Sequence, residues 1–132
     1  MLFVAAIVGG LSLSLAYAPV SFTYIAWIAL IPLFWGILKS KGAWSAAYIG
    51  AAFGFAFWLA SISWVYNVIN SYSDLPFLAG AGLVFLLLLL LTAFDAGVAV
   101  SSYFVIKRYG PRGLFLAPVL WVAFEYVKTY FM

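Results

Sequence analysis

The sequence predicts an all-α membrane protein, a polytopic bundle of about five transmembrane helices whose N-terminus is cytoplasmic. Three observations lead to this fold class. Of the 132 residues, 69% are hydrophobic and 7% are charged, with a mean hydropathy of +1.22. A soluble domain is nearer half apolar and a quarter charged, so this chain cannot cover a water-facing surface. The apolar residues fall into five runs, and basic residues occupy two of the connections between the runs.

The runs form one transmembrane domain over residues 1–132, and a crossing takes roughly 20 residues. The expected helices cover residues 2–16, 21–38, 43–66, 77–106 and 113–131. The net charge of +3 is small and lies mostly between the runs, which indicates membrane topology and excludes a nucleic-acid partner. The chain has no Cys and no His. It therefore lacks thiolate nucleophiles, disulfides and the usual zinc ligands, and we expect no metal and no cofactor.

The first run is followed by the sequence Ala16-Tyr17-Ala18-Pro19. A secretory signal peptide is the alternative here, because Ala16-Tyr17-Ala18 fits a small-residue cleavage pattern. No Lys or Arg precedes the run, however, and Pro19 would directly follow the cut, where its fixed φ disfavours a protease-bound strand. A first transmembrane helix with a short turn at Pro19 is therefore favoured.

The second run contains Pro32, which kinks a helix but is tolerated inside a membrane bundle. Aromatic residues lie toward its two ends, as in the aromatic belts of membrane helices. These residues are Tyr24, Trp27 and Trp35. A short basic connection with Lys39 and Lys41 follows, and it separates the second helix from the third.

The third run is the helix against which we expect the other helices to pack. Ala46, Gly50 and Gly54 recur at every fourth residue, so they share one helical face. Small residues let a second helix approach closely, and close van der Waals contact drives helix association in lipid. Trp64 and Tyr66 near the end of this run suit a membrane boundary.

The connections predict the orientation of the helices. The basic connections, with Lys39 and Lys41 in one and Lys107, Arg108 and Arg112 in the other, should be cytoplasmic. Residues 17–20 and the polar stretch 67–76 carry no Lys or Arg, so they should face the opposite side. Met1 is then inside, and Met132 lies at or beyond the outer face. The fourth run is longer than a straight crossing needs, which predicts tilt or an interfacial start.

Asp95 lies near the middle of the fourth run, where a carboxylate costs about 2.5–3.5 kcal/mol on insertion scales. It is either a functional group that faces the bundle interior or a protonated or hydroxyl-bonded residue that packs two helices. The sequence indicates no Lys, Arg or His at a similar depth, which favours the packing interpretation.

Trp121, Glu125 and Lys128 are spaced i, i+4 and i+7, so they share one face of the fifth helix. Glu125 is either an interfacial residue paired with Lys128, worth a few tenths of a kcal/mol, or a polar group that lines a cavity open to the outer face. Trp58, Trp64 and Tyr66 could line a lipid-binding groove, although such aromatic residues are more often interfacial anchors.

Several short motifs follow one another in an order that is shared with a known family. They are Leu15-Ala16-Tyr17-Ala18-Pro19, Gly54-Phe55, Ser63-Trp64-Val65-Tyr66 and Leu75-Pro76, then a leucine-rich helix, a basic turn, Ala117-Pro118, Leu120-Trp121 and Glu125. Their order and spacing over nearly the whole chain resemble the N-terminal membrane part of bacterial apolipoprotein N-acyltransferases. The chain departs from the family pattern at Asp95, where the resemblance implies a neutral residue.

The resemblance implies that the complete enzyme has about eight transmembrane helices and a periplasmic nitrilase-like domain. A Glu-Lys-Cys triad in that domain would take an acyl chain from a phospholipid as a thioester and pass it to the α-amino group of a lipoprotein. This chain has no Cys and is truncated relative to the family, so we expect no catalytic residue in it and no activity from it alone.

The implied role is a multi-pass anchor and lipid entrance in the bacterial inner membrane. Trp64, Tyr66, Trp121 and Glu125 are the candidates for lining a lipid or substrate cavity. The implied partners are membrane phospholipid, an apolipoprotein substrate and a missing or separate nitrilase-like domain. Two alternatives remain: a small scaffold or transporter fragment with Asp95 at its centre, and a complete short protein that binds lipid or a separate catalytic subunit.

Overall fold

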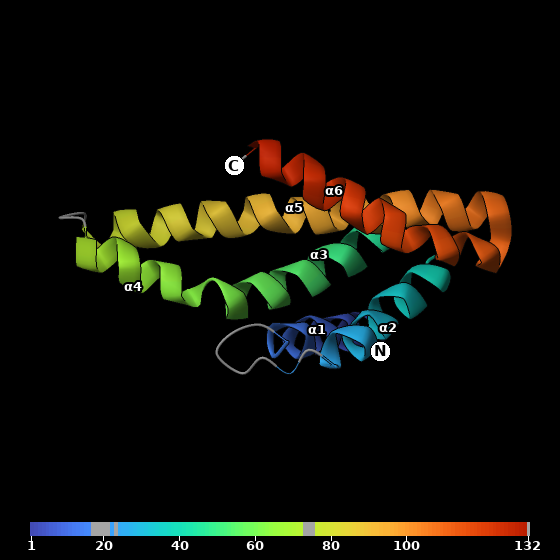
Figure 1. Cartoon of the computed structure of the whole chain (residues 1–132), viewed down its shortest axis with the longest axis horizontal. Helices are drawn as coiled ribbons and strands as arrows, with labels where there is room; N and C mark the ends of the chain where they lie inside the picture. The colour runs from blue at the N-terminus through green and yellow to red at the C-terminus, as the bar shows by residue number, and fades with distance from the viewer. Residues whose placement is uncertain (17–21, 23, 73–75, 132) are drawn as a thin grey trace.

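The computed structural model describes residues 1–16, 22, 24–72 and 76–131, and over these residues the protein is a bundle of helices without strands (Figure 1). This confirms the predicted all-α class. The turn expected at Pro19 lies outside the described residues. The helices are α1 (Leu2–Ser14), α2 (Ile25–Leu38), α3 (Ala43–Ser61), α4 (Ser63–Tyr72), α5 (Phe77–Tyr109), the 3₁₀ helix η1 (Gly110–Leu116) and α6 (Ala117–Phe131).

Helix α3 lies at the centre of the bundle, where it contacts α1, α2, α4 and α5. Its Phe53 is completely buried and belongs to one apolar cluster with Ala6 of α1, Leu33 of α2 and Ala99 of α5. Figure 1 shows α3 running beneath the long helix α5, with α1 and α2 on its other side. Four helices therefore share one core, and α3 supplies the side chains that connect them.

The contact between α3 and α5 is made at glycine positions, where the two backbones come close. A Cβ atom at Gly50 would lie 2.5 Å from the Cβ of Ala99 and 2.9 Å from the carbonyl oxygen of Asp95, and one at Gly54 would collide with the Asp95 side chain. Ala46, one turn before Gly50, is fully buried. Any side chain larger than hydrogen at Gly50 or Gly54 would push the two helices apart.

A second glycine contact, which was not predicted from the sequence, joins α1 to its neighbours. A Cβ atom at Gly9 would lie 2.8 Å from the carbonyl oxygen of Ala29 in α2, and one at Gly10 would collide with the backbone of Phe53 in α3. Because consecutive helical residues point in directions about 100° apart, these two adjacent glycines let α1 approach two helices at once.

The helix that the sequence predicted over residues 43–66 is divided at Ile62, and residues 67–72 are helical rather than part of a loop. The Ser63 hydroxyl donates to the carbonyl of Ala60 at 3.3 Å, a local bond that competes with regular helix geometry. The side chains of Tyr66 and Ile69 then pack against the beginning of α5 near Gly80. Tyr66 also contacts the ring of Phe77 at 5.7 Å between centroids. This packing stabilises α4.

Helix α5 has 33 residues, which corresponds to a length of about 50 Å. It extends three residues beyond the predicted end at 106 and stops at Gly110, whose φ of 68° favours glycine. Residues 110–116, part of them expected as a loop, form η1, which reverses the chain into α6 (Figure 1). The hydrocarbon core of a bilayer is about 30 Å thick, so α5 is long enough to cross it even when tilted.

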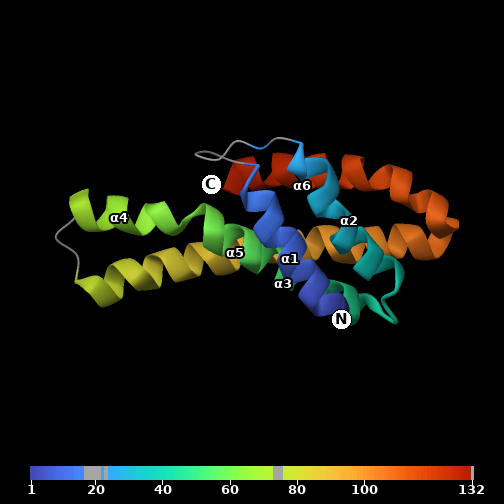
Figure 2. The same ribbon diagram turned by 90° about the horizontal axis from the view of Figure 1, so that it is seen from below.

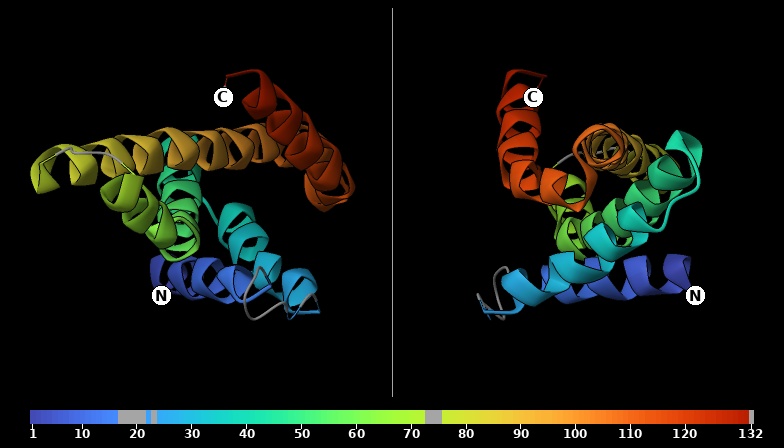
Figure 3. Two further views of the ribbon diagram at one scale, coloured as in Figure 1. Left: turned by 60° about the vertical axis from the view of Figure 1, so that its left-hand side comes forward. Right: turned by 90° about the vertical axis from the view of Figure 1, so that its right-hand side faces the viewer.

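Within the part of the chain that the structure describes, two helical segments are long and apolar enough to cross a membrane: α3, and the segment Phe77–Tyr130, which covers α5, η1 and nearly all of α6. Leu83, Phe85 and Leu86 of α5 are exposed, as lipid-facing side chains are. In Figure 2, α1 and α2 lie side by side, and the right panel of Figure 3 looks along α5 while α1 lies across the view. With 13 and 14 residues, α1 and α2 are shorter than a full crossing, so their crossings stay predictions.

We predict that Gly50→Ala destabilises the protein, because the added methyl group overlaps Ala99 and overpacking costs about 1–3 kcal/mol. Gly82→Ala is the matched control: it lies in α5 with no atom within 4 Å of the added Cβ, and alanine favours a helix by up to about 1 kcal/mol. Thermal unfolding in detergent, followed by circular dichroism, measures both. Equal melting temperatures for the two variants would contradict the packing role proposed for Ala46, Gly50 and Gly54.

Candidate functional site

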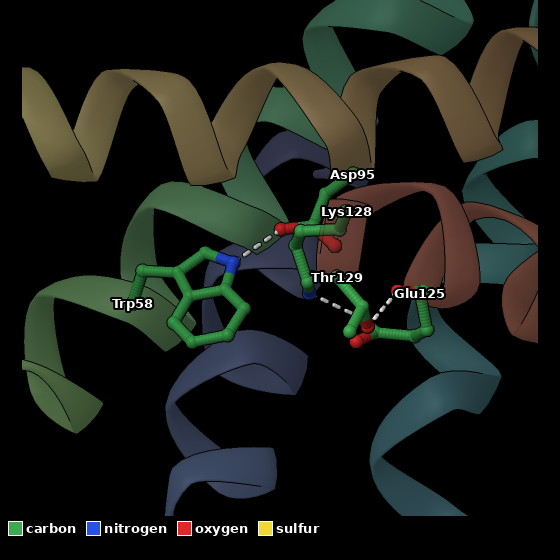
Figure 4. A network of polar contacts seen from close by, with 5 residues as sticks. All are labelled: Trp58, Asp95, Glu125, Lys128 and Thr129. Atoms are coloured by element: carbon green, nitrogen blue, oxygen red, sulfur yellow. Dashed lines mark hydrogen bonds and ion pairs between the residues drawn. The ribbon is translucent and has the colours of Figure 1, made fainter. Parts of the chain in front are cut away.

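Asp95 lies where α3, α5 and α6 meet, and it is buried with 4% of its surface exposed. Its Oδ2 atom accepts a hydrogen bond from the indole Nε1–H of Trp58 at 2.7 Å (Figure 4). A hydrogen bond to a carboxyl group is among the stronger ones, and it satisfies an acceptor that lipid could not. The Asp95 side chain also packs directly on Gly54, so this glycine makes room for it.

Lys128 approaches the same site from α6. Its Nζ atom lies 4.7 Å from the centre of the Trp58 ring and donates to Oε1 of Glu125 at 2.6 Å (Figure 4). Only 9% of the Lys128 surface is exposed. The expectation that no cation lies near Asp95 is therefore wrong, because the Lys128 ammonium group lies over the ring whose N–H is bonded to Asp95. We call Trp58, Asp95, Glu125 and Lys128 the polar cluster.

Trp58 takes part in two of the three interactions of the polar cluster: its N–H at the ring edge bonds Asp95, and its ring face contacts Lys128. Its aromatic character alone favoured an interfacial anchor, whereas in the structure Trp58 contacts α5 and α6 inside the bundle. The spacing could have revealed this, because Trp58 continues the series of Ala46, Gly50 and Gly54 by one more helical turn. The face that packs on α5 therefore ends in a side chain that can donate a hydrogen bond.

The four candidates for a lipid or substrate cavity are divided between two places. Trp64 and Tyr66 belong to α4, where Trp64 is 61% exposed and Tyr66 contacts Phe77. Trp121 belongs to α6 and packs against the main apolar cluster, and Glu125 follows it one turn later beside Lys128. The structure thus brings Glu125 to the Asp95 site but does not join it to the α4 pair.

An apolar groove of about 610 Å³ lies between α1, α3 and α5, away from the four cavity candidates. Its walls include Phe3, Leu11, Phe55 and Leu89, and its size falls within the usual range for ligand pockets. Thr92 lines it with a buried hydroxyl that has no hydrogen-bond partner among the described residues. Such a lining can hold hydrocarbon and offers little to a charged ligand.

The polar cluster contains carboxyl groups, an ammonium group and an indole, but no thiol or imidazole, because the chain has neither Cys nor His. The ammonium group of Lys128 and the carboxylate of Glu125 neutralise each other's charge, which lowers the cost of placing them in a bundle surrounded by lipid. What this arrangement can do chemically is to link three helices, because the hydrogen bond of Trp58 joins α3 to α5 and the cation–π contact of Lys128 joins α6 to α3. This geometry supports the packing interpretation of Asp95, because its side chain lies against Gly54 of α3 and accepts a hydrogen bond from Trp58 of the same helix.

We predict that Trp58→Phe destabilises the protein by about 1–3 kcal/mol, because it leaves the buried Asp95 carboxyl without its donor. Trp64→Phe is the matched control: the same change at an exposed tryptophan should alter the stability by less than about 0.5 kcal/mol. Asp95→Asn should be milder than Asp95→Ala, because an amide oxygen still accepts from Trp58. Denaturation midpoints in detergent test the series, and equal effects at positions 58 and 64 would refute it.

Comparison with known proteins identifies the family. Residues 9–132 match the model of the apolipoprotein N-acyltransferase N-terminal domain. The apolipoprotein N-acyltransferase of Geobacter metallireducens is 28% identical over 131 residues, which are 97% of this chain and 24% of the relative. That of Coxiella burnetii is 29% identical over 130 residues, or 96% of this chain and 26% of the relative. The chain spans about a quarter of the length of these curated relatives. It belongs to the apolipoprotein N-acyltransferase family and corresponds to the N-terminal domain of that family.

Proposed function

We propose that this chain is the membrane-embedded portion of an apolipoprotein N-acyltransferase, which anchors the enzyme and shapes the path by which lipid reaches it. The observation that carries the proposal is the match to the family's N-terminal domain over residues 9–132. The relatives are named for the transfer of an acyl group to an apolipoprotein. Because the chain has no Cys, a thioester on this segment has no side chain on which to form.

The proposed role includes a multi-pass arrangement in the bacterial inner membrane, with membrane phospholipid and an apolipoprotein as substrates of the complete enzyme and a nitrilase-like domain as catalytic partner. The apolar groove between α1, α3 and α5 supports a lipid-handling role, because hydrocarbon lines it. Trp64 and Tyr66 on α4, and Trp121 and Glu125 on α6, remain proposed contacts for lipid or substrate in two separate places, neither of which lines this groove.

The alternative is a small scaffold or transporter fragment in which Asp95 exchanges ions. The geometry favours it less, because the Asp95 side chain is packed on Gly54 and bonded to Trp58. A transporter carboxyl group must be reached by its ion during each cycle, whereas a packing residue can stay enclosed. Loss of ion-coupled flux in Asp95→Asn, with unchanged stability, would favour the alternative.

We predict that the chain alone produces no triacylated lipoprotein in phospholipid nanodiscs, whereas its residues 9–132, joined in place of the matching segment of the Geobacter metallireducens relative, support acyl transfer. Mass spectrometry of a diacylated lipoprotein substrate measures both. The relative without its N-terminal segment is the control that isolates the contribution of this domain. A well-folded fusion that transfers no acyl group would argue against the proposed function, and so would acyl transfer by the chain alone.

The proposed topology places Lys41 and Arg108 on the cytoplasmic side and Ser71 on the opposite side. Single cysteines can report this directly, because the chain has none of its own. In intact spheroplasts, a membrane-impermeant maleimide should label Ser71→Cys and leave Lys41→Cys and Arg108→Cys unlabelled until the membrane is opened. Labelling of Lys41→Cys and Arg108→Cys from different sides would refute the arrangement.

A further inference from the structure

Helix α6 is attached to the bundle mainly along one face and mostly by incompletely buried side chains. Among its residues 117–130, only Ala117 at the beginning and Lys128 near the end are buried. Between them, Trp121 packs on the apolar cluster and Phe124 packs on Gly97 of α5, both half-buried. The left panel of Figure 3 shows α6 rising away from α5 toward its C-terminal end. The last buried attachment of α6 is therefore a charged side chain.

Lys128 reaches α3 and not merely its own helix. Its ammonium group lies over the ring of Trp58, which in turn donates to Asp95 of α5 (Figure 4). One aromatic ring thus receives the cation on its face and bonds the carboxyl group at its edge. Tryptophan is the side chain best suited to both tasks, because it has the strongest cation–π face and an N–H donor.

We propose that Lys128 is a latch that fixes the C-terminal half of α6 on α3 and α5 through the ring of Trp58. Lys128 and Trp58 are then the residues that position α6. Glu125 contributes less to this placement, because it pairs with Lys128 within the same helix. The proposal concerns the placement of α6 and stands independently of the proposed acyltransferase role.

The other end of α6 is suited to act as the pivot. Gly113 in η1 lies so close to α5 that an added Cβ atom would be 2.9 Å from the carbonyl oxygen of Val105. The beginning of α6 is therefore held by backbone packing at η1 and by the buried Ala117. Beyond Phe124, Lys128 is the one buried side chain among residues 125–130, so we expect the C-terminal end of α6 to change its angle when the cation is removed.

Distance measurement between two spin labels tests the latch. Labels at Leu86→Cys of α5 and Val127→Cys of α6 occupy exposed positions outside the polar cluster, and the chain has no other cysteine. The unaltered cluster should give one narrow distance distribution in nanodiscs. Lys128→Met keeps the length of the side chain but removes the cation. It should lower the ratio of latched to unlatched molecules about tenfold, within the range of a desolvated cation–π contact.

Three variants separate the latch from general effects of charge. Lys107→Met removes an exposed lysine from the last turn of α5 and should leave the distribution unchanged. Lys128→Arg keeps a cation that stacks on aromatic rings and should retain the narrow distribution. Glu125→Gln removes the partner within the helix but keeps the contact with Trp58, so it should also retain most of the latched population.

The outcomes decide the proposal in either direction. A narrow, unshifted distribution for folded Lys128→Met would overturn it, and so would equal broadening by Lys107→Met. If Lys128→Met does not fold in detergent, Trp58→Phe decides instead, because it keeps an aromatic ring but offers a weaker face and no N–H. If Trp58→Phe broadens the distance distribution between the two labels while the helix content is retained, the latch is supported. If Trp58→Phe gives the same narrow distribution as the unaltered protein, the latch is rejected.

Discussion

The close approach of α3 and α5 at Gly50 and Gly54 is the contact on which the rest of the structure depends. In lipid, the burial of apolar surface between helices gains little free energy, because lipid tails are as apolar as the side chains. Helices therefore associate through close van der Waals packing and through polar contacts. The two glycines provide the shape, since even a methyl group at these positions would meet α5. The same approach brings Asp95 within reach of Trp58, so the shape of the interface makes its hydrogen bond possible.

The interior of the bundle combines a well-paired polar cluster with isolated hydroxyl groups. Asp95, Trp58, Lys128 and Glu125 each have a partner that another side chain supplies, as polar groups at membrane depth require. The hydroxyls of Thr92 and Ser102 in α5 are buried without a partner among the described side chains and backbone. The charged groups, whose burial is most costly, are therefore the ones that are paired.

The sequence was sufficient to predict the helical class, most helix positions and the face of α3 that meets α5, because these depend on local composition and on four-residue spacing. It was not sufficient for contacts that tertiary structure creates. The helical state of residues 67–72 depends on packing of Ile69 near Gly80, and the site around Asp95 depends on a lysine 33 positions later in the chain. Polar composition suggested a loop at the first place. At the second, no cation was expected near Asp95, and this favoured a role in packing two helices.

The order in which the polar cluster is completed has a consequence for biogenesis. Trp58 and Asp95 both precede α6, so their hydrogen bond and the glycine contact can form as soon as α5 has entered the membrane. Helix α3, already in the membrane, thereby assists the insertion of α5, because its Trp58 supplies a hydrogen-bond donor for the Asp95 carboxyl group. Lys128 arrives only with α6, so the growing chain would pair its buried acid with an indole first and gain the cation at a later stage of synthesis.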